Sequence, residues 1–269
     1  MTFKVGFIGG GAMGEAIISG LINAGIISHE ALSASDINNK RLDYLTQNYK
    51  ISTYYDNGKL LEENQVIILA LKPQMVSEVL FPIKENFTRD KLVISLAAGI
   101  SINYLYKFIP QDVGVVRVMS NMPALIGKGV SGVAFSENVS GEQRELTVKI
   151  LEAVGKVYIL PEKLLNAVTG LSGSGPAYVY LIIEALTDAG VRVGIPRDIA
   201  GELALNTVIG AAEMIKETEI HPVLLKDKVV TPAGTTIAGL YALEKSGIRA
   251  AFMDAVMAAT ERSRELGSD

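Results

Sequence analysis

The chain of 269 residues contains no cysteine, only two histidines and no basic run. Disulfide bonds and thiol catalysis are therefore excluded, and the composition fits a reducing cytoplasm, where we expect the protein to act. A net charge of −4 and a pI near 5.4 argue against nucleic-acid binding. The best candidate for a membrane span, residues 177–186, already contains Glu184, so we expect no transmembrane helix. The first strand is predicted to begin almost at once, so we expect no signal peptide.

Apolar residues are abundant. They make up 49% of the chain, and the mean hydropathy of +0.30 is high for a soluble monomer. A chain of this length can form one large domain or two medium ones. We expect the excess apolar surface to be buried in a subunit interface.

A strand, a glycine-rich turn and a helix are predicted at the start of the chain. The apolar run Val5–Ile8 leads into Gly9-x-Gly11-x-x-Gly14, and apolar residues at helical spacing follow over residues 15–24. Such a turn directs backbone N–H groups and a helix N-terminus at one point, where a pyrophosphate can bind. The same pattern also occurs for steric reasons alone. The presence of Asp36, 22 residues after Gly14, favours a dinucleotide site, because an acid at this distance holds the ribose hydroxyls.

Strands and helices alternate through the first half. Further strands are predicted over residues 31–35, 51–53, 66–70, 92–96 and 113–118, with a helix capped by Asn38 and a turn at residues 56–58. In a parallel sheet the carboxyl ends of these strands lie along one edge, so the loops that contain Gly9, Asp36, Lys72, Ala97 and Asn121 should converge. Lys72-Pro73 alone could be a strand terminator, and Ala97-Ala98-Gly99 alone a packing point. Several small residues together favour a ligand site.

The pattern changes near Pro161. Before it, strands over residues 133–135 and 157–159 flank a helix over residues 141–154; after it, only helices are predicted, over residues 177–193, 197–218, 236–246 and 248–266. We therefore expect an α/β Rossmann-like dinucleotide-binding domain over residues 1–161 and an all-α domain over residues 162–269. These helices are apolar on more than one face, which indicates that they pack against a second copy.

Two further segments contain hydroxyl groups near a helix start. In Thr231-Pro232-Ala233-Gly234-Thr235-Thr236, three threonines stand before a helix whose N–H groups would suit a carboxylate, although ordinary capping by Thr235 or Thr236 explains the segment as well. In residues 169–178, Ser172 and Ser174 are candidate hydroxyls. This segment is not a nucleophile elbow, because no strand is predicted before it.

General bases are scarce. His29 and His221 are both expected at the surface, so neither is a candidate for the base that alcohol oxidation requires. An imine substrate removes this requirement, because its nitrogen is protonated before hydride arrives.

The motifs together resemble pyrroline-5-carboxylate reductase. They are Phe7-Ile8-Gly9-x-Gly11-x-Met13, Ala70-x-Lys72-Pro73, Ala97-Ala98-Gly99, the serine–glycine stretch Gly170–Tyr178 and Pro232-x-Gly234-Thr235-Thr236-Ile237, and the resemblance runs from about residue 3 to residue 266. It implies NAD(P)H-dependent reduction of 1-pyrroline-5-carboxylate to L-proline, the last step of proline biosynthesis. It also implies a homodimer through the C-terminal helices, in many members assembled into a ring of five dimers. No metal is expected.

Site residues are carried over by position. The resemblance implies that the substrate carboxylate is held by Thr231, Gly234, Thr235 and Thr236, with Glu219 nearby, and that the Thr236 hydroxyl assists protonation of the ring nitrogen. It implies cofactor contacts from Ile8, Gly9, Gly10, Gly11, Ala12, Met13, Asn57, Ala70, Leu71, Lys72, Pro73, Ala97, Ala98 and Gly99. Asp36 completes this set from its place after the second strand.

The sequence departs from the family pattern in places. Met119-Ser120-Asn121-Met122-Pro123 replaces the usual Met-Pro-Asn-Thr-Pro, and Thr231 and Ala233 replace a serine and a glycine. Asp36 would repel a 2′-phosphate, so we expect NADH to be preferred over NADPH, although Lys40 and Arg41 could neutralise a phosphate. Two alternatives remain: a related reductase of another cyclic imine or a hydroxy acid, and a non-catalytic dinucleotide-binding regulatory protein.

Overall fold

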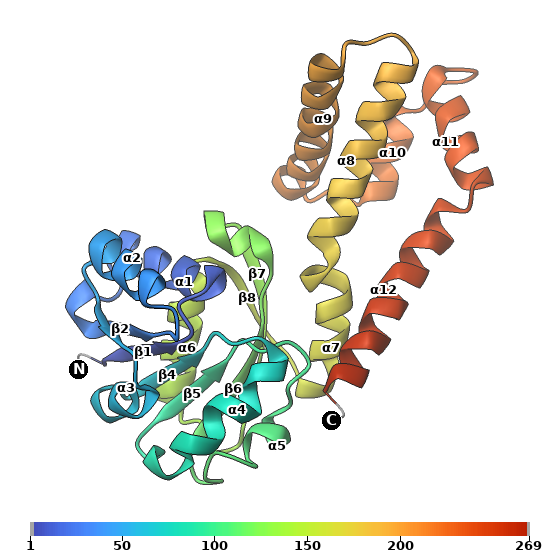
Figure 1. Cartoon of the computed structure of the whole chain (residues 1–269). Helices are drawn as coiled ribbons and strands as arrows, with labels where there is room; N and C mark the ends of the chain where they lie inside the picture. Colours follow the sequence, from blue (N-terminus) through green and yellow to red (C-terminus); the bar gives the residue numbers. More distant parts are fainter. Residues whose placement is uncertain (1–2, 268–269) are drawn as a thin grey trace. The chain divides into compact units, whose positions relative to one another are not determined.

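The computed structural model describes residues 3–267, and the chain forms two compact units (Figure 1). The first unit comprises the chain up to Ser174 together with the C-terminal segment from Met257. The second unit is Gly175–Val256. The chain leaves the first unit 13 residues after the expected boundary at Pro161 and returns to it near the C-terminus. No helix among the described residues is both long and apolar enough to cross a membrane.

The first unit is built on one sheet of eight strands in the order β3-β2-β1-β4-β5-β6-β7-β8. Neighbouring strands are parallel except for β6 and β7, which are antiparallel. The strands are β1 (Val5–Ile8), β2 (Leu32–Ser35), β3 (Ser52–Tyr54), β4 (Val66–Leu69), β5 (Leu92–Ser95), β6 (Gly114–Met119), β7 (Gly129–Phe135) and β8 (Gly155–Ile159). The predicted α/β Rossmann-like architecture is confirmed.

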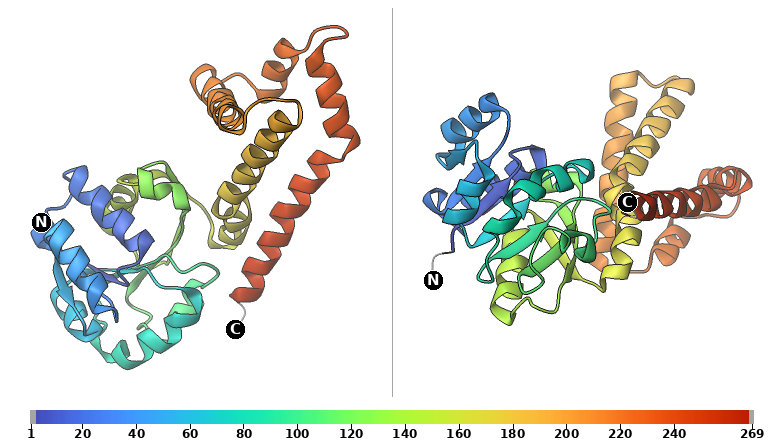
Figure 2. Two further views of the ribbon diagram at one scale, coloured as in Figure 1. Left: turned by 45° about the horizontal axis from the view of Figure 1, so that its top comes forward. Right: turned by 60° about the horizontal axis from the view of Figure 1, so that its bottom comes forward.

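Helices cover both faces of this sheet, which gives three layers (Figure 2). Alternate residues of β4 point to opposite faces: Ile68 packs with α1 (Ala12–Asn23), α2 (Asn39–Tyr49) and α6 (Gly141–Glu152), whereas Ile67 and Leu69 pack with α3 (Asn57–Glu63), α4 (Val76–Leu80) and α5 (Ile102–Leu105). This alternation is a consequence of the two-residue period of a strand that is buried on both faces.

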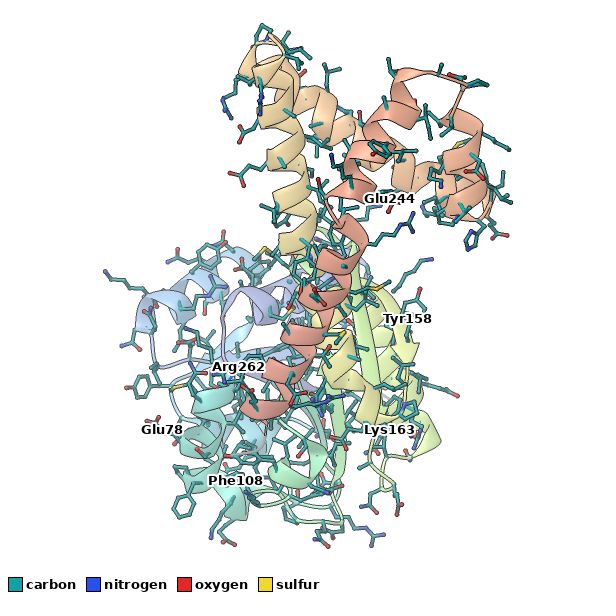
Figure 3. All side chains as sticks on the ribbon, turned by 90° about the vertical axis from the view of Figure 1, so that its right-hand side faces the viewer. Glu78, Phe108, Tyr158, Lys163, Glu244 and Arg262 are labelled. Atoms are coloured by element: carbon teal, nitrogen blue, oxygen red, sulfur yellow. The ribbon has the colours of Figure 1, made fainter. Side chains whose placement is uncertain are left out.

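Local signals explain most helix boundaries. Asn38 accepts a hydrogen bond from Lys40 N (3.1 Å) and caps α2 as predicted, and Gly25 ends α1 with a φ of +63°. The turn predicted at residues 56–58 is wrong, because Asp56 instead caps α3 by accepting from Gly58 N (2.7 Å). At the far edge of the sheet, Tyr158 of β8 stays exposed (Figure 3).

The second unit consists of helices only. They are α8 (Gly175–Arg192), α9 (Arg197–Thr218), α10 (Pro222–Val229), α11 (Thr235–Lys245) and the first half of α12 (Ile248–Leu266). All were predicted except α10, which begins at Pro222 with His221 as its cap. In the whole unit only Ala200 and Ala204 are buried. Large apolar side chains therefore remain on its surface.

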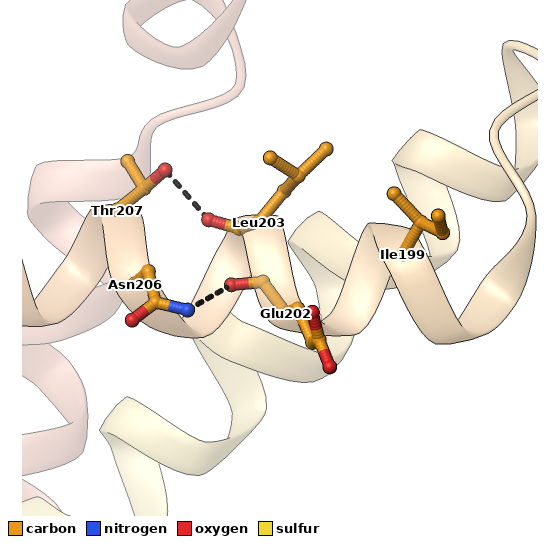
Figure 4. A pocket seen from close by; sticks show the side chains of 5 residues that line it. All are labelled: Ile199, Glu202, Leu203, Asn206 and Thr207. Atoms are coloured by element: carbon orange, nitrogen blue, oxygen red, sulfur yellow. Dashed lines mark hydrogen bonds between the residues drawn. The ribbon is translucent and has the colours of Figure 1, made fainter.

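A shallow hollow on α9 illustrates this surface. It has a volume of about 380 Å³ and is lined by Ile199, Glu202, Leu203, Asn206 and Thr207 (Figure 4). Asn206 donates to Glu202 O (2.8 Å) and Thr207 donates to Leu203 O (2.7 Å), so the polar side chains bond their own helix. The hollow therefore has the character of a packing surface.

Candidate active site

The glycine-rich turn after β1 is shaped by close backbone approach. Gly9 has a φ of +100°, and a Cβ atom at this position would lie 2.5 Å from Ala70 O. A Cβ on Gly14 would lie 2.7 Å from Gly9 O, whereas one on Gly11 would meet no described atom within 4 Å. The first and third glycines thus close the turn, and the second leaves open space before α1. No side chain caps α1, so its first N–H groups are available to an anion.

A cavity of about 440 Å³ opens along this turn. Of the predicted cofactor residues, it is lined by Ile8, Gly9, Gly11, Asp36, Asn57, Ala70, Leu71 and Lys72. These residues follow β1, β2, β3 and β4, so the expected convergence of strand ends holds for this part of the sheet. A cavity beside a glycine turn and an acid suits an adenine dinucleotide.

Five lining residues were not predicted: Ser35, Ile37, Asn38, Met75 and Val79. The first three lie next to Asp36 in the sequence, and the exposed Ile37 leaves its side chain accessible to a ligand in the cavity. Their position beside the acid was a usable signal. Met75 and Val79 lie on the 3₁₀ turn η2 (Pro73–Met75) and on α4, and neither belongs to a motif that predicts a site.

The remaining predicted cofactor residues do not line this cavity. They are Gly10, Ala12, Met13, Pro73, Ala97, Ala98 and Gly99. Gly99 has a φ of +79° and packs against the end of α12, where a Cβ atom would lie 3.1 Å from Ser263 O. The buried Ala97 belongs to the core cluster on the α3–α5 face. Packing therefore accounts for Ala97 and Gly99, and their contact with a cofactor stays a prediction.

Asp36 is fixed at the mouth of the cavity. One carboxylate oxygen accepts from Gly10 N and the other from Asn38 N, each at 2.9 Å. Nearby, the Ser35 hydroxyl donates to Asn57 Oδ1 (2.6 Å). This bond joins the last residue of β2 to the first residue of α3. Each oxygen of a carboxylate accepts more than one hydrogen bond, so Asp36 retains capacity for ribose hydroxyls.

The threonine-rich segment lies in the second unit, between α10 and α11. Gly234 N donates to Thr231 O (3.0 Å) and closes the turn, and Ala233 has a φ of +55°. Gly234 is the N-cap of α11, and no side chain caps this helix. Capping by Thr235 or Thr236 is therefore not observed, and the first N–H groups of α11 stand beside the threonine hydroxyls.

Glu219 also belongs to the second unit. It ends α9 with a φ of +55° and is exposed, and α10 separates it in sequence from the threonines. Both histidines are exposed, as predicted, and His221 Nδ1 accepts from Val223 N (3.3 Å) to cap α10. The residues predicted to bind substrate thus lie in the second unit, and the residues predicted to bind cofactor lie in the first.

The serine–glycine stretch forms a short π-helical turn, η6 (Thr169–Gly173). A Cβ on Gly173 would lie 2.4 Å from Met119 Cε, so this glycine lets the turn approach the end of β6. Asn121 Nδ2 donates to Ser172 O (3.1 Å), and the Ser172 hydroxyl donates to Val168 O (3.1 Å). The Ser172 hydroxyl therefore bonds the backbone, and no strand precedes the turn, because α7 (Leu165–Val168) does.

The comparisons with known proteins cover the whole chain. A family model described as pyrroline-5-carboxylate reductase dimerisation matches residues 162–266, and one described as NADP oxidoreductase, coenzyme F420-dependent, matches residues 4–99. A pyrroline-5-carboxylate reductase of Methanosarcina acetivorans is 46% identical over 264 residues, which are 98% of each chain.

Two solved structures are similar over nearly their full length. The pyrroline-5-carboxylate reductase of Coxiella burnetii is 34% identical, with a TM-score of 0.93 and complete coverage of both chains. The pyrroline carboxylate reductase of Plasmodium falciparum, solved with NADP bound, is 36% identical and has a TM-score of 0.90, covering 99% of this chain and 98% of its own. The likeness therefore includes the glycine turn, the threonine segment and the sequence between them, and the chain belongs to the pyrroline-5-carboxylate reductase family.

Proposed function

We propose that this chain reduces 1-pyrroline-5-carboxylate to L-proline with a reduced nicotinamide dinucleotide, as the last step of proline biosynthesis. The observation that carries the proposal is the uncapped start of α11, where backbone N–H groups and the hydroxyls of Thr235 and Thr236 stand together in a chain of this family. These groups suit a carboxylate beside a ring nitrogen. The cavity at the glycine turn, with Asp36 in its lining, supports binding of the dinucleotide there.

Each group of predicted site residues has its own proposed role. Gly9 to Met13 would hold the pyrophosphate at the start of α1, Asp36 the adenosine ribose, and Thr231, Gly234 and Thr235 the substrate carboxylate. When bound, the reduced nicotinamide supplies a hydride to the imine carbon, and the nitrogen takes a proton. Thr236 would hydrogen-bond this nitrogen and assist its protonation. Glu219 would be an acidic residue near the substrate-binding loop. Asn57, Ala70–Pro73 and Ala97–Gly99 complete the proposed cofactor contacts.

Substitution of Thr236 tests the proposal. Because a positioned donor or acid contributes about 10²-fold or more, Thr236→Ala should lower kcat/KM for pyrroline-5-carboxylate by about that factor, measured as loss of NADH absorbance. Thr236→Ser keeps the hydroxyl and should retain most of the activity. Thr235→Ala is the matched control on the neighbouring residue and should act mainly on KM. An unchanged kcat/KM in Thr236→Ala would remove this residue from the mechanism.

The alternatives are disfavoured by particular residues. Related folds that interconvert hydroxy acids and keto acids need a lysine on the helix that follows the sheet domain. The helix α8 contains no lysine. A non-catalytic relative is expected to lose the threonine segment, which is intact here. A related cyclic imine as substrate would appear as a higher kcat/KM for that imine in the same assay.

We propose further that NADH is preferred. Asp36 places a carboxylate where NADPH carries its 2′-phosphate, and like charges repel. Steady-state rates should show a higher kcat/KM with NADH, and Asp36→Asn should narrow the difference by removing the charge. A kcat/KM at least about tenfold higher with NADPH would contradict the argument from Asp36. The reducing cytoplasm stays a prediction from the absence of cysteine.

A further inference from the structure

A cluster of polar side chains beside the glycine turn is not explained by the proposed reaction. Glu15, in the first turn of α1, accepts hydrogen bonds from Tyr44 OH (3.0 Å) and Tyr49 OH (2.7 Å), both on α2. Its other carboxylate oxygen pairs with Arg41 Nη2. Arg41 Nε also donates to Gly10 O, and its guanidinium lies over the Tyr44 ring, 4.8 Å from the centroid. Arg41 is therefore held by Glu15, Gly10 and Tyr44 at once.

Arg41 and Asp36 lie on two sides of the same glycine. Gly10 donates its N–H to Asp36 and accepts from Arg41 at its carbonyl oxygen. An ideal Cβ on Gly10 would lie 3.4 Å from both Arg41 Cγ and Asp36 Oδ2. No ion pair joins Arg41 to Asp36 in the part of the chain that the structure describes. Arg41 thus contacts the same glycine as Asp36, but its guanidinium bonds Gly10 O and Glu15.

An arginine next to this acid is the usual means of accepting a 2′-phosphate, because a guanidinium matches phosphate in charge and geometry. Here Glu15 already neutralises the arginine. The carboxylate remains ionised near neutral pH: burial raises the pKa of Glu15, but hydrogen bonds from Arg41, Tyr49 and Tyr44 lower it more, to a net value below normal. A 2′-phosphate would have to displace an existing ion pair to recruit Arg41.

We propose that Glu15 is a positioning residue for cofactor choice, which holds Arg41 against the glycine turn and so withholds it from a 2′-phosphate. The inference rests on the proposed preference for NADH and gives that preference a second cause besides the charge of Asp36. Removal of the Glu15 carboxylate frees Arg41 to turn toward the ribose. NADPH then gains a partner that NADH cannot use.

The experiment compares kcat/KM for NADPH with kcat/KM for NADH in matched variants. In Glu15→Ala the NADPH/NADH ratio should rise about tenfold, the size expected of one charge-assisted contact. In Glu15→Ala with Arg41→Ala it should return to the wild-type value. Arg41→Ala alone should leave the ratio unchanged, because the clamped guanidinium takes no part.

Two controls separate this effect from general damage to the fold. Tyr44→Phe with Tyr49→Phe removes two hydrogen bonds but leaves Glu15 paired with Arg41, so the ratio should not move. Lys40, exposed on the same helix, is the competing cation; Lys40→Ala in the Glu15→Ala background should keep the raised ratio. Thermal unfolding verifies that each variant is folded.

A binding measurement makes the test independent of the reaction. Calorimetry with adenosine 2′,5′-bisphosphate and with 5′-AMP isolates the 2′-phosphate, and Glu15→Ala should improve the affinity for the bisphosphate alone by about tenfold. Failure of pyrroline-5-carboxylate reduction would refute the proposed function and leave this readout intact. The proposal is overturned if Glu15→Ala changes neither the NADPH/NADH ratio of kcat/KM nor the affinity for the bisphosphate relative to 5′-AMP. It is also overturned if the double variant keeps the raised NADPH/NADH ratio, or if Arg41→Ala alone lowers that ratio.

Discussion

Ala233 and Gly234 lie side by side in the turn before α11, yet their backbones impose different requirements. Ala233 has a φ of +55°, in the left-handed region that favours glycine. Gly234 has ordinary extended geometry, but a Cβ atom there would lie 2.2 Å from Thr231 Oγ1. A side chain at position 233 costs conformational free energy. A Cβ atom at position 234 would collide with the Thr231 hydroxyl where it now lies.

Ala233→Gly should therefore stabilise the folded turn by up to about 1 kcal/mol, because glycine adopts this φ without strain. Part of the gain is offset by the greater entropy of glycine in the unfolded chain. Urea unfolding of the two proteins measures the difference. A clearly lower stability for Ala233→Gly would show that the backbone is not strained in solution.

Gly234→Ala provides the contrast. The added methyl group would force the Thr231 hydroxyl to rotate and would crowd the start of α11, so KM for the substrate should rise while the cofactor KM stays unchanged. Equal effects on both KM values would indicate a wider disturbance than this turn.

At the scale of elements, α1 and α2 are joined by polar contacts as well as by the core. Burial, and then the Glu15 carboxylate, raise the pKa of Tyr49 to about 12, because a buried phenolate beside a carboxylate is unfavourable. A group whose folded pKa lies above its unfolded value of about 10 contributes stability below that value, and the contribution is lost as the pH rises toward 12.

The free energy of unfolding should accordingly fall between pH 10 and 12. Tyr49→Phe cannot ionise, so its stability should decline less steeply over this window, and the two curves should converge at the alkaline end. Urea titrations at several pH values give both curves. Parallel curves would mean that Tyr49 titrates alike in the folded and unfolded chains.

Most elements were predictable because their signals are local. The strand periods, the Asn38 cap and Gly25, which follows the C-cap of α1, all lie within a few residues of the element they define. The helices α3, α4, α5, α7 and α10 were not predicted, because each is short. In addition, α3 and α10 begin with residues typical of turns, Asp56-Asn57-Gly58 and His221-Pro222. Short helices depend more on tertiary packing than on their own sequence.

Long-range pairs could not be predicted. Arg117 of β6 is buried, pairs with Glu162 (3.3 Å) and donates to Asn166 Oδ1 (2.7 Å), and the Ser263 hydroxyl of α12 donates to the same oxygen (3.2 Å). In the sequence, Arg117 is 45 residues from Glu162 and 49 residues from Asn166, and Asn166 is 97 residues from Ser263. For the site, the strand-end rule located Asp36 and Lys72, but the clamp of Arg41 by Glu15 depends on how α2 packs on α1.

At the scale of the whole molecule, the second unit lacks a core of its own. A hollow of about 760 Å³ on α8 and α9 is lined mainly by apolar residues, including Leu181, which is 65% exposed. The matching family model carries the description of a dimerisation region over residues 162–266. We therefore propose a homodimer through these helices.

Size-exclusion chromatography with light scattering should give a dimer or a multiple of it at micromolar concentration. Leu181→Glu places a charge in the apolar surface and should shift the protein toward monomer, with a lower Tm. Lys216→Glu changes a charge on an exposed polar part of α9 and should leave the assembly intact. A wild-type monomer at this concentration would end the proposal.

The return of the chain to its first unit has a consequence for synthesis. Residues from Met257 onward complete a unit whose other members end at Ser174, with Ser263 bonded to Asn166 and Gly99 packed under the last turn of α12. During synthesis, the part of this unit that ends at Ser174 therefore lacks the helical segment until residues 257–267 have left the ribosome. The contacts of this unit are complete only once that segment has been made and has packed against it.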